Sequence, residues 1–221
     1  MHKQKSHEVF YQFKVWLLDS PLPIWRRFLL RSDVPLNMLH EVTQIAMGWW
    51  EFHEYEFQVA GRRFSDEQEK LAPGVESDLD TRLCDVVSEP GDRIHYVYNF
   101  AANWQHEIVL EGITPMEPST KGGRPFAYCF GGKRACPPEK INGVAEYREF
   151  VNAIEDPNHS NREKMLGLIN YAFDPDAFDV GQVNIRLLVM DAEFSFYEKE
   201  LIARKKRNKL VVLKPRAGKS R

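Results

Sequence analysis

The sequence lacks the features that would assign it to the membrane or the secretory pathway. None of its 221 residues fall in an apolar run near the ~20 residues that a membrane-spanning helix needs. The opening residues, MHKQKSHEVFYQFK, lack the apolar stretch of a signal peptide. The three cysteines are an odd number, which argues against a disulfide framework and for a reducing compartment. We therefore expect a cytoplasmic protein that makes no membrane contact.

The common catalytic signatures are also missing. There is no nucleophile elbow, no dinucleotide fingerprint and no phosphate-binding loop. His40 and His53 lie thirteen residues apart, which does not fit the HExxH spacing of zinc hydrolases. The sequence favours a non-enzymatic protein, but it leaves the question of a reaction open.

What the sequence does have is a strong charge asymmetry. The formal net charge is -2, yet the last eighteen residues, Arg204 to Arg221, contain nine Lys and Arg and no acid. The rest of the chain therefore carries 21 basic and 32 acidic residues, a net charge of -11. Such a tail is either a solvated extension or an arm that binds nucleic acid or an acidic protein. The nucleic-acid candidates are Arg204, Lys205, Lys206, Arg207 and Lys209.

The spacing of apolar residues predicts an α+β fold. Alternation predicts strands over residues 9–18, 24–30, 54–59, 93–100 and 104–113. Helical spacing predicts helices over residues 36–46, 79–87, 147–154 and 160–169, a last short helix capped by Asp179, and a charged helix over 195–207.

The order of these elements, β-β-α-β-α-β-β, predicts a β-grasp-like mixed β-sheet with additional C-terminal helices. Residues 65–80 are predicted to form an exposed loop, and residues 114–125 a linker. We expect an α+β domain over residues 1–190, followed by a charged helical extension and basic tail over residues 191–221.

The segment YCFGGKRACPPE, Tyr128 to Glu139, raises the main chemical question. Cys129 and Cys136 are six residues apart, a spacing that fits neither a zinc knuckle nor a usual thiol-disulfide pair. We favour a rigid loop anchored by buried cysteines. A zinc site formed by both cysteines with His106, and a redox pair, are the alternatives. If the segment is a structural loop, no cofactor is expected.

Basic and aromatic residues supply the other candidates. In WRRF, Trp25 to Phe28, the two arginines face opposite sides of a strand, so one is expected to pair with a buried acid and the other to meet solvent or a ligand. The ordinary explanation is a strand whose arginines meet neighbouring acids. An aromatic beside arginines also occurs on nucleic-acid-binding surfaces. Trp104 and His106 are expected to border a ligand pocket beside the loop. The ligand-binding candidates are Arg26, Arg27, His53, Trp104, His106, Lys133, Arg134 and Glu139.

Five segments together resemble one known family. PIWRRFLL, LHEVTQIAMGWWEFHEYEF, WQHEIVLE, YCFGGKRACPPE and FDPDAFDVGQVN are similar to the plasmid pRiA4b ORF-3-like family, some of whose members are labelled as relatives of a transposon-associated gene. The resemblance covers residues 9–187 and implies a compact α+β domain without implying a reaction.

The chain lacks several of the carboxylate, cysteine and histidine residues that occur in the family pattern. The turn that usually reads Asp-Phe-Gly-Asp-Asp-Trp is Asn99 to Trp104 here, without a carboxylate. A third cysteine is replaced by Ile141-Asn142-Gly143, and His-x-His by His53-Glu54-Tyr55. Each change removes a potential metal ligand or acid–base group.

Three functional hypotheses follow. The first is a non-enzymatic binding protein of uncharacterised function, associated with nucleic acid or a mobile element such as a plasmid. The second is a metal-dependent enzyme or metal-binding protein centred on Cys129, Cys136, His106 and Glu139. The third is a partner-binding adaptor that uses the aromatic residues Trp49 and Trp50. DNA binding across salt concentrations, metal analysis and exposure of the tryptophans distinguish them.

Overall fold

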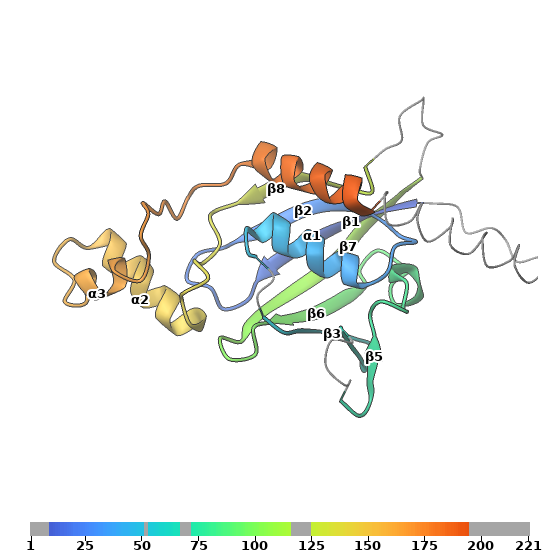
Figure 1. The fold of residues 1–221 in the computed structure, drawn as a ribbon, viewed down its shortest axis with the longest axis horizontal. Coiled ribbons are helices and arrows are strands. Elements are labelled where there is room, and N and C mark those ends of the chain that lie inside the picture. The colour runs from blue at the N-terminus through green and yellow to red at the C-terminus, as the bar shows by residue number, and fades with distance from the viewer. Residues whose placement is uncertain (1–8, 51–52, 67–71, 116–124, 195–221) are drawn as a thin grey trace, which may run out of the picture.

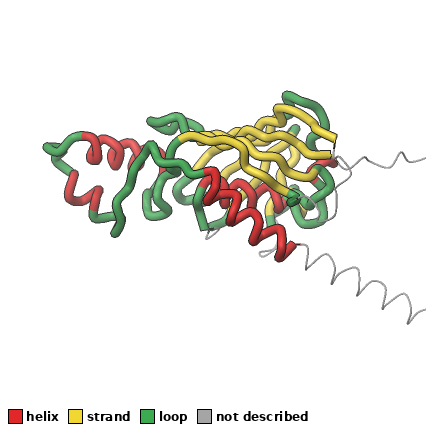
Figure 2. The backbone as a smooth tube through the Cα atoms, turned by 90° about the horizontal axis from the view of Figure 1, so that it is seen from above, coloured by secondary structure: helices red, strands yellow, loops and turns green. Residues whose placement is uncertain are grey.

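The computed structural model describes residues 9–50, 53–66, 72–115 and 125–194, which form one sheet with helices on one of its faces (Figures 1 and 2). The strands are β1 Val9–Leu17, β2 Trp25–Arg31, β3 Tyr55–Val59, β4 Arg62–Ser65, β5 Val75–Ser77, β6 Arg93–Tyr98, β7 Trp104–Pro115 and β8 Ala127–Lys133. The helices are α1 Asn37–Met47, α2 Gly143–Glu155, α3 Arg162–Leu166 and a helix over residues 180–194, with a 3-10 turn at Leu83–Asp85.

The described strands form one sheet of eight, in the order β5-β4-β3-β6-β7-β1-β2-β8. Among these described strands only β4 and β5 pair in parallel, so the sheet is mixed and the predicted α+β class is confirmed. The β-grasp-like topology is not confirmed; the β1–β2 hairpin lies between β7 and β8. Along β1, Phe13 and Val15 are fully buried while Lys14 is partly exposed, as strand alternation requires.

The helices divide into two groups. α1 and the helix over residues 180–194 cover the same face of the sheet, whereas α2 and α3 project as an arm at one end (Figures 1 and 2). The predicted start of the last helix is confirmed, because Asp179 Oδ1 accepts the backbone N–H groups of Gly181 and Gln182. α3 instead has Asn161 at its N-cap without a side-chain capping bond, so the predicted capping box from Ser160 is wrong.

Two local predictions fail where the elements are short. β4 and β5 lie within or beside the predicted loop of residues 65–80, and the predicted helix over residues 79–87 is one 3-10 turn. Strands of three or four residues carry too little alternation to be recognised. The region is also partly buried rather than exposed. Asp78 is 0% exposed, and the hydroxyl of Tyr55 donates to its carboxylate at 2.5 Å.

The predicted domain boundary falls inside the last helix, which passes continuously through residue 190. The charged extension and the basic tail after residue 194 lie outside the described residues, so the division into two parts stays a prediction. Within the described ranges, no helix is both long enough and apolar enough to cross a bilayer.

Candidate functional site

Four of the five segments that carry the family resemblance meet around one cleft. Its volume is about 520 Å³, within the range of ligand-binding clefts. The walls come from the end of α1 and the following tryptophans, the loop of residues 135–140, the segment of residues 169–179 and the first turn of the last helix. Segments distant in the sequence therefore build a single candidate site.

Arg26 forms the base of the cleft and is only 2% exposed. Its Nε donates to the carbonyl of Ala46 at 2.7 Å, at the end of α1. Nη1 donates to the carbonyls of Trp25 and Lys133 at 2.8 and 2.9 Å, and Nη2 to that of Arg134 at 2.7 Å. All four hydrogen bonds go to main-chain oxygens, so the predicted pairing of the buried arginine with an acid is wrong. Burial lowers the pKa of Arg26, and the arginine acts as a clamp that joins α1, β2 and the end of β8.

The glycine pair in YCFGGKRACPPE makes room for two aromatic rings. β8 contains both glycines, so the predicted loop is a strand in its first half. Phe178 lies 4.2 Å from the guanidinium of Arg26, and a Cβ atom on Gly132 would stand 2.5 Å from that phenyl ring. On the other face of the sheet, a Cβ atom on Gly131 would stand 3.6 Å from the ring of Trp25. Gly132 is therefore required by packing, whereas a side-chain methyl at position 131 would make only an ordinary contact.

The Pro-Pro-Glu end of the segment holds the tryptophan turn after α1. Trp49 donates its indole N–H to the carbonyl of Pro137 at 2.9 Å. The backbone N–H of Trp50 donates to Glu139 Oε1 at 2.9 Å, and the hydroxyl of Tyr98 donates to the same oxygen at 3.4 Å. Trp49 is buried, but Trp50 is 64% exposed at the cleft.

Of the two cysteines of the loop, Cys129 is buried and Cys136 is half-buried at the cleft. Cys129 is 0% exposed, and burial raises its pKa. Burial also raises the pKa of Cys136 to about 12, so its thiol is protonated at neutral pH. A protonated thiol is a poor nucleophile and a poor metal ligand.

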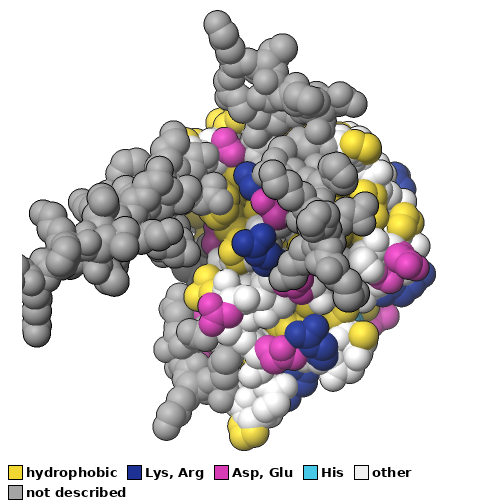
Figure 3. All heavy atoms as spheres, turned by 90° about the vertical axis from the view of Figure 1, so that its right-hand side faces the viewer, with side chains coloured by type: hydrophobic (Ala, Val, Ile, Leu, Met, Phe, Trp, Pro, Cys, Tyr) yellow, Lys and Arg dark blue, Asp and Glu magenta, His cyan; other side chains and the backbone are white. Residues whose placement is uncertain are grey.

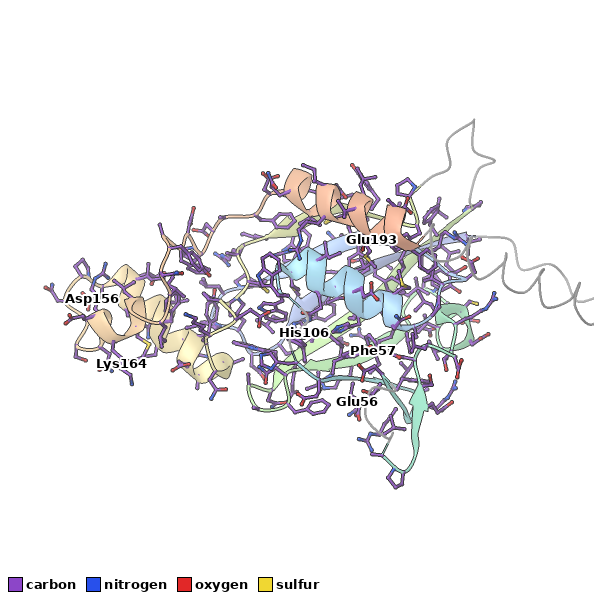
Figure 4. All side chains as sticks on the ribbon, viewed as in Figure 1. Glu56, Phe57, His106, Asp156, Lys164 and Glu193 are labelled. Atoms are coloured by element: carbon purple, nitrogen blue, oxygen red, sulfur yellow. The ribbon has the colours of Figure 1, made fainter. Side chains whose placement is uncertain are left out.

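His106 lies between α1 and the sheet, in the core (Figure 4). It is 0% exposed and packs against the rings of Trp49 and Tyr96 at centroid distances of 5.4 and 5.2 Å. Burial lowers its pKa to about 3. Within the described ranges, no three His, Cys, Asp or Glu side chains are grouped to hold a metal, so the predicted set of His106, Cys129 and Cys136 is not brought together.

The remaining predicted residues occupy several environments. Trp104 is buried beside Trp49, and neither it nor His106 lines the cleft, because both point inward from β7. His53 is exposed and meets the ring of Tyr98 edge-on at 5.8 Å.

The basic candidates of β2 and the loop are mostly outside the cleft. Arg27 faces the opposite side of the sheet from Arg26 and pairs with Glu111 at 2.8 Å. Lys133 is exposed, and Arg134 pairs with Asp176 at 2.9 Å. Lys133 and Arg134 do not line the cleft, whereas Glu139 does.

Comparison with known proteins gives the family. Residues 9–182 match the family described as plasmid pRiA4b ORF-3-like protein. This chain belongs to the pRiA4b ORF-3-like family. It is 32% identical over 170 residues to the uncharacterized protein y4hQ of Sinorhizobium fredii, covering 76% of this chain and 85% of y4hQ.

A solved structure of unknown function shares the fold. The crystal structure of protein MM3350 from Methanosarcina mazei Go1 superposes with a TM-score of 0.69 and 27% identity, covering 81% of this chain and 98% of MM3350. Neither relative has an assigned activity in its name. The comparisons thus give the pRiA4b ORF-3-like family and its fold, and no specific function.

The turn without carboxylates has a structural role in this family member. Asn99 and Asn103 adopt left-handed φ angles of 55° and 53°, which asparagine tolerates. Asn99 Oδ1 accepts the backbone N–H of Ala102 at 3.1 Å. The carbonyl of Ala102 then packs against Gly143, where a Cβ atom would stand only 2.6 Å from it. The turn joins β6 to β7 and supports the start of α2.

Sequence reasoning missed several residues that line the cleft. They are aromatic and acidic side chains from the segment before the last helix and its N-cap. These residues are Tyr171, Phe173, Phe178, Asp174 and Asp179, the last of which was predicted only as a helix cap. The FDPDAFD segment contained a usable signal, because acids and aromatics alternate there, but nothing in the sequence placed it beside β8.

Proposed function

We propose that this protein is a non-enzymatic binding protein whose cleft accepts a positively charged side chain of a partner protein. The observation that carries the proposal is the combination of carboxylates and exposed aromatic rings in one cleft. Glu139, Asp174 and Asp179 line it together with a single exposed ammonium, Lys140, a net charge of -2. Arg26 adds a positive charge at the base, but four carbonyl groups surround its guanidinium.

Aromatic rings in the cleft favour the same ligand. Trp50 and Tyr171 are 64% and 58% exposed. A cation over such an exposed ring gains about 0.5–1 kcal/mol. The chain itself shows this contact, because the guanidinium of Arg186 lies 5.1 Å from the Trp50 ring. Carboxylates beside aromatic rings suit an arginine or lysine side chain better than an anion.

The carboxylates are fixed by the backbone, which supports binding rather than proton transfer. Glu139 accepts the N–H of Trp50, and Asp179 caps the last helix. Asp174 Oδ1 accepts the N–H of Asp176. These bonds hold negative charges in place, and the neighbouring thiol of Cys136 stays protonated. The cleft thus offers charge and rings in a fixed arrangement.

The test is binding of a short arginine-containing peptide, followed by tryptophan fluorescence, with a glutamate-containing peptide of the same length as comparison. We expect the basic peptide alone to bind, and more weakly as salt is added. The charge variant keeps the capping and accepting oxygens but removes three charges: Glu139→Gln, Asp174→Asn and Asp179→Asn.

A matched control removes three charges from the α2–α3 arm, where Asp156 lies away from the sheet (Figure 4). Exposed ion pairs contribute about 0.2–1 kcal/mol each, so the cleft variant should bind roughly tenfold more weakly. Equal binding by the cleft variant and the parent would contradict the proposal. The control substitutions are Glu155→Gln, Asp156→Asn and Glu163→Gln.

We propose nucleic acid as a second candidate partner, and more specifically the DNA of a plasmid or another mobile element. The nine Lys and Arg residues after Ala203 support binding to nucleic acid. The family is named after a plasmid, which is the reason for suggesting plasmid DNA. Figure 3 shows one face of the molecule, and among the described residues on that face acidic and basic side chains are interleaved rather than gathered into one basic patch. The tail is therefore the main electrostatic support for this candidate.

Duplex DNA binding measured at several salt concentrations tests the tail. Counterion release predicts an affinity that falls by orders of magnitude between about 50 and 200 mM salt. A chain that ends at Ala203 should lose this binding, and no binding by the full chain at low salt would exclude it. An acidic protein is the alternative partner of the tail, and a polyglutamate competitor tests it.

A further inference from the structure

Trp16 of β1 and Trp25 of β2 alternate with buried residues, so they lie on the face of the sheet opposite the core. Figure 2 shows that no described helix covers one face of the sheet. Trp16 of β1 stands directly opposite Trp25 of β2 in the strand register. The Lys14 ammonium lies 5.2 Å from the Trp16 ring centroid and 5.9 Å from that of Trp25. Arg27 lies 5.1 Å from the Trp25 centroid. Aromatic rings and cations are thus interleaved on adjacent strands.

The rings also border a hollow at the end of the β1–β2 hairpin. Its volume is about 380 Å³, and both tryptophans, Lys14, Asp19 and Ser20 are among its lining residues. The Ser20 hydroxyl is buried and has no hydrogen-bond partner among the described residues. The hollow therefore combines two indole rings, an ammonium group, the carboxylate of Asp19 and a free hydroxyl, within the volume range of sites for small organic groups.

The charge of this face differs from that of the whole chain. The register places Lys133 of β8 beside Trp25, and Glu107 of β7 beside Trp16. Glu107 forms an ion pair with Arg93, and Glu111 pairs with Arg27. Lys14 and Lys133 thus add positive charge beside the tryptophans, although the chain before residue 204 carries a net charge of -11.

We propose that this tryptophan face binds single-stranded nucleic acid, with bases stacked on Trp16 and Trp25 and phosphates held by Lys14 and Lys133. Only unpaired bases expose the flat faces that stack on rings of this kind. A base that displaces the Lys14 side chain from the rings leaves its ammonium free for a phosphate. The inference rests on the nucleic-acid candidate above and is independent of the cleft.

The experiment measures binding of fluorescent twelve-nucleotide oligo(dT) and oligo(U) to the full chain, by anisotropy and by tryptophan quenching. Loss of one stacked base costs about 1–3 kcal/mol, so Trp16→Ala and Trp25→Ala should each weaken binding roughly 5-fold to 100-fold. Trp16→Phe and Trp25→Phe keep a ring and should retain most of the binding. Phe100→Ala removes an exposed ring in the turn between β6 and β7; it is the control and should bind like the parent.

The outcomes separate this inference from the candidate on which it rests. Equal binding of single-stranded and duplex DNA, unchanged in a Trp16→Ala and Trp25→Ala double variant, would overturn the tryptophan face and leave the tail as the contact. No binding of any oligonucleotide by the full chain at 50 mM salt or below would overturn both. Selective binding of either single strand, lost with the rings, supports the inference.

Discussion

The glycine pair of β8 gives the sharpest test of the fold around the cleft. Gly132→Ala adds one methyl group that would stand 2.5 and 2.6 Å from two atoms of the Phe178 ring and 2.8 Å from Arg26 Cδ. These distances are far below van der Waals contact, and four hydrogen bonds fix Arg26. Phe178 must therefore move away from the guanidinium.

The expected cost follows from that movement. Overpacking in a closed site costs about 1–3 kcal/mol, which includes here the lost contact between Phe178 and Arg26. For a chain of this size, 1 kcal/mol lowers the melting temperature by about 2–4 °C. We expect Gly132→Ala to melt roughly 3–10 °C below the parent. Gly131→Ala places its methyl 3.6 Å from the Trp25 ring, an ordinary contact, and should change the free energy of unfolding by less than about 0.5 kcal/mol.

Urea unfolding of both variants, followed by tryptophan fluorescence, measures the two free energies. Gly131→Ala is a close control, since the two substitutions are chemically identical and one residue apart. Equal stability of the two variants, or a larger loss in Gly131→Ala, would refute the packing described around Arg26.

Three further predictions concern the core of the site. Arg26→Lys should lower the free energy of unfolding in urea by about 3 kcal/mol or more, because an ammonium group cannot replace the guanidinium that binds four carbonyl groups. Arg27→Lys, the control, should lower it by less than about 1 kcal/mol. Similar losses in the two variants would contradict the role of Arg26 as a clamp. The pKa values of His40 and His106 are lowered to about 3, so the unfolded state binds more protons below pH 6.5, and stability should fall by about 2 kcal/mol per histidine between pH 7.5 and 5. His106→Phe should remove about half of that dependence, and a flat profile in the parent would contradict it. Native Cys136 should react slowly with iodoacetamide at pH 7 until urea unfolds the chain, because its thiol is protonated, and rapid alkylation of the folded protein would contradict the raised pKa.

Local sequence pattern was enough to predict most of the sheet and the first helix. Alternation located β1, β2, β6 and β7, and Gly48 ends α1 at a left-handed φ of 98°, as a glycine after a helix does. The opposite directions of Arg26 and Arg27 also follow from alternation alone. These features depend on neighbours in the chain, which a single sequence contains.

The candidate site could be predicted only in part, because it depends on contacts between distant segments. The sequence identified Arg26 and Glu139, but not that one binds carbonyls and the other the N–H of Trp50. It placed His106 at a pocket, although inward alternation along β7 puts that ring in the core. Chain reversal after α3 brings Phe178 back to Arg26, and no local pattern indicates such a contact.

An NMR titration with the arginine-containing peptide tests the proposed cleft most directly. It should shift the indole N–H signal of Trp50 and backbone signals of residues 135–140 and 170–179, and leave the indole signals of Trp16 and Trp25 unchanged. A titration that moves no signal around the cleft, or moves those of the charge variant and the parent equally, would contradict a cleft built to receive a cation.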